Sequence, residues 1–301
     1  MGFFGAQRFA AFKAALAGTG LVPAECVRVH DRGALYTPFV PDVERAPSRV
    51  KGLEDWLAGA QSVIVLGLHF PDTVLDTAKV TPAETTGPFA FVMYESLRLL
   101  SDAAMQVVKR LKDTGYRAVL ATDLTGLASQ AANPRGRQVD LRGNRFAAVL
   151  AGLGTIGLHG HVLTPEFGVR QRFLAIVTDC PIPDSPLCTA PSACAACDKD
   201  CLDACPTRAI QGDTVPLTVG GVQFDVPRVA GLACDWAKLY GLSGEAGAKY
   251  LGLGVDVPVP DAPSGADVAK AAASAEFGVQ KRLLSLAEEC VRVCPAHKAG
   301  G

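Results

Sequence analysis

The sequence predicts an α+β protein in which an α/β domain (residues 1–178) is followed by a cysteine-rich domain (residues 179–301). Two observations support this division. Apolar stretches of strand and helix type alternate over residues 50–178, which indicates a layered α/β domain. The ten cysteines, by contrast, gather late in the chain, and six of them lie between residues 180 and 210.

The apolar pattern gives the elements of the first domain in order. Strands are expected at residues 62–68, 116–121 and 173–178, and helices at residues 3–17, 53–57 and 89–113. Glycines at positions 18 and 115 mark helix ends. Stretches rich in Pro, Gly and polar residues predict loops at residues 20–50, 71–88, 125–145 and 251–265. In the second domain, residues 211–285 form an insertion between two groups of cysteines.

The spacing of the cysteines is the most specific signal. The first group is Cys194-x2-Cys197-x3-Cys201-x3-Cys205-Pro206, and the second is Cys234 with Cys290-x3-Cys294-Pro295. Thiolates at such short intervals suit a cubane cluster, and a last cysteine followed by proline is typical of a bacterial ferredoxin half, in which that cysteine ligates the other cluster. A zinc site and a disulfide framework are the competing interpretations. The cross-over rule assigns one cluster to Cys194, Cys197, Cys201 and Cys294, and the other to Cys205, Cys234 and Cys290.

Charge and composition narrow the compartment and the partners. The formal net charge is −1, so no global basic field favours nucleic acid. The first twenty residues lack the pattern of a signal peptide, and no apolar run is long enough to span a membrane. Clustered thiols stay free to bind metal in a reducing compartment, so we expect a cytoplasmic protein without a membrane partner.

A glycine-rich motif suggests a different cofactor at first sight. Gly152, Gly154 and Gly157 match the G-x-G-x-x-G pattern of dinucleotide-binding proteins. That pattern needs a preceding strand and a following helix, and the residues after Gly157, LHGHVLTP, do not favour a helix. The glycines are therefore expected to allow a tight turn or a close backbone approach, and a nicotinamide site is disfavoured.

Residues 139–179 and the cysteine segments together resemble the family of epoxyqueuosine reductases and corrinoid reductive dehalogenases. The resemblance is carried in order by Val139-Asp140, AGLGTIG (151–157), HG (159–160), LTPEFG (163–168), VTD (177–179), CLDACPTRAI (201–210), FDVPRVAGLAC (224–234) and CVRVCPAHKAG (290–300). Any one of these motifs alone would be weak, but the ordered set is specific. It implies a nitroreductase-like α/β corrinoid- and substrate-binding domain (residues 1–178) followed by a bacterial ferredoxin-like iron–sulfur domain with two 4Fe-4S clusters (residues 179–301).

The resemblance also implies cofactors and roles for particular residues. Cobalamin would be bound without a protein imidazole on cobalt and would receive electrons from the clusters. The expected cofactor-binding residues are Gly152, Gly154, Gly157, His159, Gly160, His161, Val162, Thr164 and Phe173. Asp140 matches the family's proton donor, although an Asp among Arg135, Arg137, Arg142 and Arg145 also suits a simple ion pair. The two histidines equally suit a tight turn held by backbone hydrogen bonds.

The second cluster is one ligand short. The family supplies a further cysteine three residues before Cys290, where this chain has Ala287. Cys180, Cys188, Cys26 or a non-thiol side chain would fill the position. A three-iron cluster, or a cubane with one open iron, is the other alternative.

The resemblance implies a cytoplasmic, cobalamin-dependent iron–sulfur oxidoreductase that reduces a small-molecule substrate. Its external electron donor would be a ferredoxin, a flavodoxin or a flavoprotein reductase, and nucleic acid is not expected as a partner. One alternative is an electron-transfer or reactivating partner of a corrinoid protein. Another is an epoxyqueuosine reductase acting on tRNA, although we expect a short form without the C-terminal helical-repeat region of those enzymes.

Overall fold

The computed structural model describes residues 1–19, 21, 51–76, 91–125, 144–239, 259–261, 267, 270 and 288–297. A four-stranded sheet organises this part of the chain, in the order β1 (Gly2–Gly5), β2 (Ser62–His69), β6 (Gln171–Thr178) and β3 (Ala118–Ala121). Every neighbouring pair is antiparallel, so the mixture of helices and strands is of α+β type rather than a parallel α/β sheet. The three strands expected from the apolar runs are all present.

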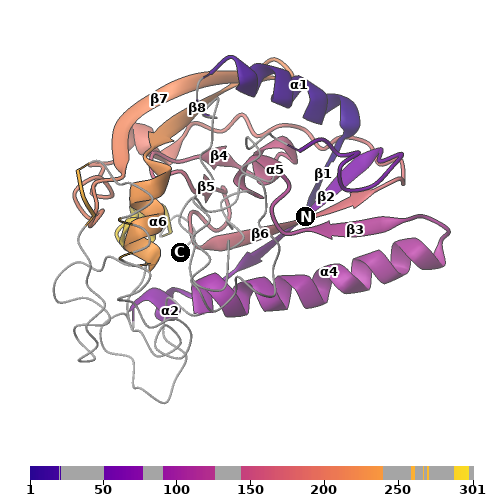
Figure 1. Cartoon of the computed structure of the whole chain (residues 1–301), viewed down its shortest axis with the longest axis horizontal. Coiled ribbons are helices and arrows are strands. Elements are labelled where there is room, and N and C mark those ends of the chain that lie inside the picture. Colours follow the sequence, from indigo (N-terminus) through magenta and orange to yellow (C-terminus); the bar gives the residue numbers. More distant parts are fainter. Residues whose placement is uncertain are drawn as a thin grey trace.

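Helix α4 (Ser96–Asp113) covers one face of the sheet, along the lower edge of the molecule in Figure 1. Its apolar side buries Leu100 and Ala104 against Ile64 of β2 and Ile176 of β6. The helix-spaced apolar residues predicted this helix, and its first turn is a π-helix, η1 (Phe91–Glu95). All eight residues of β6 are buried, which requires cover on the other face as well.

Helices α1 (Ala6–Ala17) and α5 (Arg145–Leu150) supply that second cover. A long hairpin, β7 (Ile210–Val219) and β8 (Val222–Val229), then packs over α1 (Figure 1). The first part of the expected insertion is thus built into the core of the α/β domain. The remaining elements are α2 (Asp72–Asp76), β4 (Thr155–Ile156), β5 (Val162–Leu163), the 3-10 helix η3 (Ala193–Ala196), α6 (Gly231–Leu239), α9 (Glu289–Arg292) and the 3-10 helix η4 (Pro295–His297).

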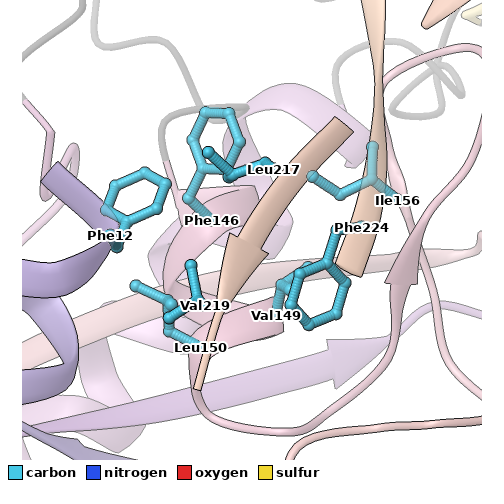
Figure 2. A pocket seen from close by; sticks show the side chains of 8 residues that line it. All are labelled: Phe12, Phe146, Val149, Leu150, Ile156, Leu217, Val219 and Phe224. Carbon is cyan, nitrogen blue, oxygen red and sulfur yellow. The ribbon is translucent and has the colours of Figure 1, made fainter. Parts of the chain in front are cut away.

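An apolar pocket lies where the hairpin meets the two helices (Figure 2). Its walls carry only apolar side chains: Phe12, Phe146, Val149, Leu150, Ile156, Leu217, Val219 and Phe224. Because no polar group reaches it, the pocket belongs to the packing of the core and has none of the polar groups that orient a ligand.

Two helix predictions were wrong in part. The helix expected at residues 3–17 begins only at Ala6, because residues 2–5 pair with β2 as a strand and the Ala6 N–H donates to the Gln61 carbonyl (2.9 Å). The helix expected at residues 53–57 is a set of turns, in which the Leu53 carbonyl accepts from the N–H groups of Trp56 and Leu57. None of the helices in the described ranges has the length and apolar character needed to cross a bilayer.

Candidate metal centre

Four thiols from two distant segments gather at one end of the sheet. Cys201 and Cys294 are buried, at 7% and 6% exposure. Burial raises the pKa of the Cys201 thiol to about 11, and the neighbouring thiols of Cys194, Cys294 and Cys197 contribute to that rise. Burial likewise raises the pKa of Cys294 to about 11, with contributions from Cys194 and Cys197. The structure therefore brings together the four cysteines that the cross-over rule assigns to one cluster.

Backbone N–H groups are directed at the sulfur atoms of this region. The N–H of Leu158 donates to Cys194 Sγ (3.3 Å), that of Lys199 to Cys197 Sγ (3.3 Å) and that of Ala209 to Cys205 Sγ (3.2 Å). Such bonds favour the thiolate form and tune a bound cluster. The chain accommodates the extra residue between Cys197 and Cys201 by placing Lys199 in the left-handed region (φ 63°).

A tight turn of the α/β domain holds the C-terminal cysteine segment. Thr164 and Gly168 exchange two backbone hydrogen bonds of 3.0 Å, and Gly168 adopts φ +55°. A Cβ at position 168 would overlap the carbonyl oxygen of Ala296 and lie 2.5 Å from its carbonyl carbon. The glycine is therefore needed both for its backbone conformation and for the close approach of the residues that follow Cys294.

A fully buried arginine lies close to this thiol group. Arg170 is 1% exposed, and its Nη1 pairs with Asp72 Oδ1 at 2.6 Å. Its positive charge opposes the rise in the pKa of Cys294. A buried cation in this position would offset part of the negative charge of a thiolate-bound cluster.

The second group of cysteines is assembled around the base of the β7–β8 hairpin. Thr207 Oγ1 donates to the Ala233 carbonyl (2.9 Å) and lies 3.9 Å from Cys205 Sγ, so it joins the Cys205 loop to helix α6, which carries Cys234. Cys205 and Cys290 both pack against the apolar cluster that contains Leu158. These contacts place Cys205, Cys234 and Cys290 in one neighbourhood, as the cross-over rule expects.

Two histidines lie beside the second group. His159 is 4% exposed, and its Nδ1 accepts the backbone N–H of His161 (3.1 Å), so its proton resides on Nε2. That Nε2 has no hydrogen-bond partner among the described residues. Burial lowers the pKa of His159 to about 4, although Glu288 opposes the change, so the ring is neutral at pH 7. His161 Nε2 lies 3.9 Å from Cys290 Sγ and 4.0 Å from Glu288 Oε2.

A buried ion pair lies next to His161. Arg172 Nη2 donates to Glu288 Oε2 through a short hydrogen bond, and the two side chains are 5% and 6% exposed. The Arg172 guanidinium also lies 5.6 Å from the centroid of the Phe70 ring. The pair links the start of β6 to the C-terminal cysteine segment. Sequence reasoning did not identify Arg170, Arg172 or Glu288; the available signal was two arginines at the start of an otherwise apolar strand.

The glycines expected at the corrinoid make close approaches within the protein. A Cβ on Gly152 (φ +74°) would overlap the Pro186 carbonyl oxygen, and one on Gly154 would lie 2.8 Å from the Leu163 carbonyl carbon. Gly157 is close to His159 in the same way, and Gly160 (φ +80°) to Arg145. Helix α5 precedes this motif, strand β4 lies within it and strand β5 follows it, so the motif lacks the strand-and-helix context of a dinucleotide site.

Some of the other residues expected at the site lie in the described part of the chain, and the rest lie outside it. Val162, Thr164 and Phe173 are buried, and Thr164 Oγ1 accepts from Gln171 Nε2 (2.6 Å). Arg145 lies 4.7 Å over the Phe146 ring, and its Nη1 donates to the Gly160 carbonyl (3.4 Å). The predictions made for Asp140, Arg135, Arg137, Arg142, Cys26 and Ala287 lie outside the described residues.

Across the residues that the structure describes, no three His, Cys, Asp or Glu side chains are gathered closely enough to hold one metal ion. A cluster of four irons separates its thiolates more widely than a single tetrahedral zinc, whose four sulfurs all lie about 2.3 Å from one centre. Thiols of the first group nevertheless lie near one another, because Cys194 packs both against the apolar cluster that contains Cys201 and against the one that contains Cys294.

Comparison with known proteins identifies relatives of two kinds. No protein-family model matches the chain. A tetrachloroethene reductive dehalogenase of Dehalobacter restrictus is 32% identical over 131 residues, which are 41% of this chain and 22% of the relative. An epoxyqueuosine reductase of Bacillus anthracis is 26% identical over 180 residues, which are 57% of this chain and 41% of the relative. The chain thus spans less than half the length of these curated relatives.

Solved structures of the same two kinds resemble the chain more distantly. A selenomethionine-labelled epoxyqueuosine reductase has a TM-score of 0.47 and 18% identity, and the match covers 94% of this chain and 64% of the reductase chain. A catabolic reductive dehalogenase has a TM-score of 0.44 and 15% identity, and the match covers 59% of this chain and 23% of the dehalogenase chain. The sequence relatives, all of them reductases, confirm what the motifs predicted: this chain is related to the epoxyqueuosine reductases and the reductive dehalogenases.

Proposed function

We propose that this chain is an iron–sulfur oxidoreductase that passes electrons through two clusters to a bound cobalamin and thereby reduces a small molecule. The observation that carries the proposal is that Cys194 packs against two apolar clusters, one of which contains Cys201 and the other Cys294, which lies more than ninety residues later in the sequence. Thiols from two separate cysteine groups meet in this way in proteins of the two-cluster ferredoxin type.

The first site suits an iron–sulfur cluster in its donors and its surroundings. Four thiols converge, backbone N–H groups bond Cys194 and Cys197, and Arg170 supplies a buried positive charge. Thiols with a pKa near 11 are protonated at neutral pH, so metal binding must displace their protons. We therefore expect iron loading of this site to become tighter as the pH rises. Cys205, Cys234 and Cys290 would hold the second cluster.

Cobalamin, when bound, supplies a redox-active cobalt that serves as a nucleophile and reductant. In the described part of the chain, His159 is the residue that fits a role beside it. Its neutral ring carries a buried Nε2–H without a hydrogen-bond partner, a donor suited to an amide oxygen of the corrinoid or to a substrate. Arg145, which donates to the Gly160 carbonyl, fixes the turn that presents His159.

Asp140 is the proposed proton donor, on the strength of its position in the family motif. A carboxyl group buried beside an apolar macrocycle has a raised pKa and can donate a proton at neutral pH. Asp140→Asn should then abolish turnover while leaving iron content and cobalamin binding unchanged. Loss of the metal centres together with activity would instead indicate an ion pair that maintains the fold.

Anaerobic preparation followed by metal analysis tests the whole proposal. We expect about eight irons per chain, as two 4Fe-4S clusters require, and stoichiometric binding of added cobalamin measured by its visible spectrum. Cys201→Ser should lose iron, and Cys180→Ser, a thiol outside both groups, should not. Zinc in place of iron, or cysteines joined as disulfides, would refute the proposal. Iron without affinity for cobalamin would favour an electron-transfer or reactivating partner of a corrinoid protein.

Epoxyqueuosine reduction is the second candidate, because the Bacillus anthracis relative shares 26% identity over 180 residues. Incubation of the reduced, cobalamin-loaded protein with tRNA that contains epoxyqueuosine distinguishes the two. Conversion of the modified nucleoside would replace the small-molecule substrate with tRNA. Lack of conversion by protein with full metal content would leave the first candidate.

A further inference from the structure

We propose that His161 is the fourth ligand of the second iron–sulfur cluster, which it binds through Nε2 together with Cys205, Cys234 and Cys290. The inference depends on the proposed function, because it concerns one of its two clusters. Three thiols are available at this site, whereas each cubane needs four ligands, and the sequence has Ala287 where a fourth cysteine would be expected.

Contact geometry singles out His161. Its Nε2 lies 3.9 Å from Cys290 Sγ, and its side chain is 11% exposed. The His161 carbonyl accepts from the N–H of Gly157 (2.8 Å), which fixes the backbone of the residue in the β4–β5 turn. Ligands on neighbouring irons of a cluster stand farther apart than 3.9 Å, so the ring turns about its side-chain torsions on binding while this backbone stays in place.

Cys180 lies too far from Cys290, at the other end of the sheet, to be the fourth ligand of the second cluster. Arg172, near the start of β6, pairs with Glu288, two residues before Cys290. Cys180 follows the other end of the same strand, where its N–H donates to Thr178 Oγ1 (3.1 Å). Six residues of strand separate the two ends, a distance of about 20 Å.

Cys188 is excluded by the hairpin in the same way. The neighbouring Leu187 packs at the tip of the hairpin, where its Cδ1 would lie 3.1 Å from a Cβ on Gly220. Cys205 lies at the hairpin base, where its sulfur accepts the N–H of Ala209. The ten residues of β7 separate base from tip by roughly 30 Å.

The neighbouring carboxylate, that of Glu288, is already paired with Arg172. Glu288 Oε2 accepts the short hydrogen bond from Arg172, and the two charges compensate each other inside the protein. An imidazole nitrogen is therefore the better donor to iron at this position. Histidine in place of cysteine is known to raise the reduction potential of a cluster, so the second cluster should accept electrons more readily than one with four thiolates.

Iron counting and pulsed EPR on the anaerobic, reconstituted full chain test the assignment. His161→Ala should bind about seven irons per chain instead of about eight, and its oxidised form should show the EPR signal of a three-iron cluster. His161→Cys should keep all irons and lower the potential of the second cluster. In wild-type protein labelled with 15N-histidine, the reduced second cluster should show a directly bound nitrogen, and His161→Cys should lose that coupling. His69→Ala, which removes an exposed imidazole, is the matched control.

Several results would overturn the assignment without touching the proposed function. Retention of all irons by His161→Ala, with only the potential changed, would mean that His161 contacts Cys290 Sγ without binding iron. Conversion of the cluster by Cys26→Ser, with His161→Ala unaffected, would make Cys26 the ligand. Absence of iron from the wild-type chain would instead refute the proposed function itself.

Discussion

Gly168→Ala is the substitution that most directly tests how the C-terminal cysteines are held. Gly168 adopts φ +55°, and a methyl group there would overlap the Ala296 carbonyl oxygen and lie 2.9 Å from the backbone nitrogen of His297. All the atoms concerned belong to the backbone, so no side chain can rotate away. The segment of residues 288–297, which carries Cys290 and Cys294, must therefore move.

The expected cost has two parts. An L-residue in the left-handed region loses about 1–2 kcal/mol relative to glycine. Forcing extra volume into a packed contact adds about 1–3 kcal/mol, because Val291 (0% exposed) and Cys294 pack in the apolar cluster below the turn. Gly168→Ala should thus cost about 2–5 kcal/mol in the free energy of unfolding and should lower iron content at both clusters.

Gly115→Ala is the matched control. Gly115 has φ +91°, and a Cβ there meets nothing within 4 Å, so this change should cost only the backbone part, about 1–2 kcal/mol, and leave the iron content intact. Urea unfolding and iron counting on the two variants separate strain from docking. Equal stability and equal iron in both would refute the contact between the Gly168 turn and the C-terminal segment.

Three further substitutions probe other contacts by urea unfolding. Arg172→Met leaves the buried Glu288 carboxylate uncompensated and should cost about 3–5 kcal/mol, and adding Glu288→Gln should recover most of that loss; no recovery would contradict the pairing. Phe224→Ala removes a wall of the apolar pocket and should cost about 3–5 kcal/mol, so a cost below 1 kcal/mol would mean that the hairpin is not docked. Asn144→Ala removes a buried amide whose Oδ1 accepts from the Leu124 N–H and whose Nδ2 donates to main-chain carbonyls of Thr122 and Phe173, and it should cost about 1–3 kcal/mol. Asn144→Asp keeps the acceptor but buries a carboxylate against those carbonyls, so it should cost at least as much; a smaller cost would contradict the Nδ2 bonds.

Periodicity alone predicted much of the sheet and its long helix. The strands at residues 62–68 and 173–178 are apolar throughout because both faces of the sheet are covered, and such runs are easily recognised. The short strand Gly2–Gly5 was missed, because Phe3 and Phe4 also fit the helical spacing of Phe9 and Phe12. What decided the matter was pairing with β2, a long-range contact that local periodicity does not contain.

For the candidate site, too, the sequence predicted one part, the first cysteine group, and missed another, the buried ion pair. The cross-over rule grouped Cys294 with Cys194, Cys197 and Cys201, because ferredoxin spacing already encodes a contact between distant segments. Nothing comparable pointed to the pairing of Arg172 with Glu288, which are 116 residues apart and belong to no motif. Buried ion pairs are chosen by the three-dimensional packing around them, and so they emerge only from the fold.

The start of strand β6 connects the metal centre to the sheet. Arg170 opposes the rise in the pKa of Cys294, and Arg172 binds Glu288, while the rest of the strand forms the centre of the apolar core. The C-terminal segment also inserts Val291 beside Phe70, the residue that follows β2. These contacts join the cysteines to the two central strands, so the sheet restricts the movement of the thiols. A cluster held in this way would undergo little rearrangement when its charge changes, as the proposed electron transfer to cobalamin would require.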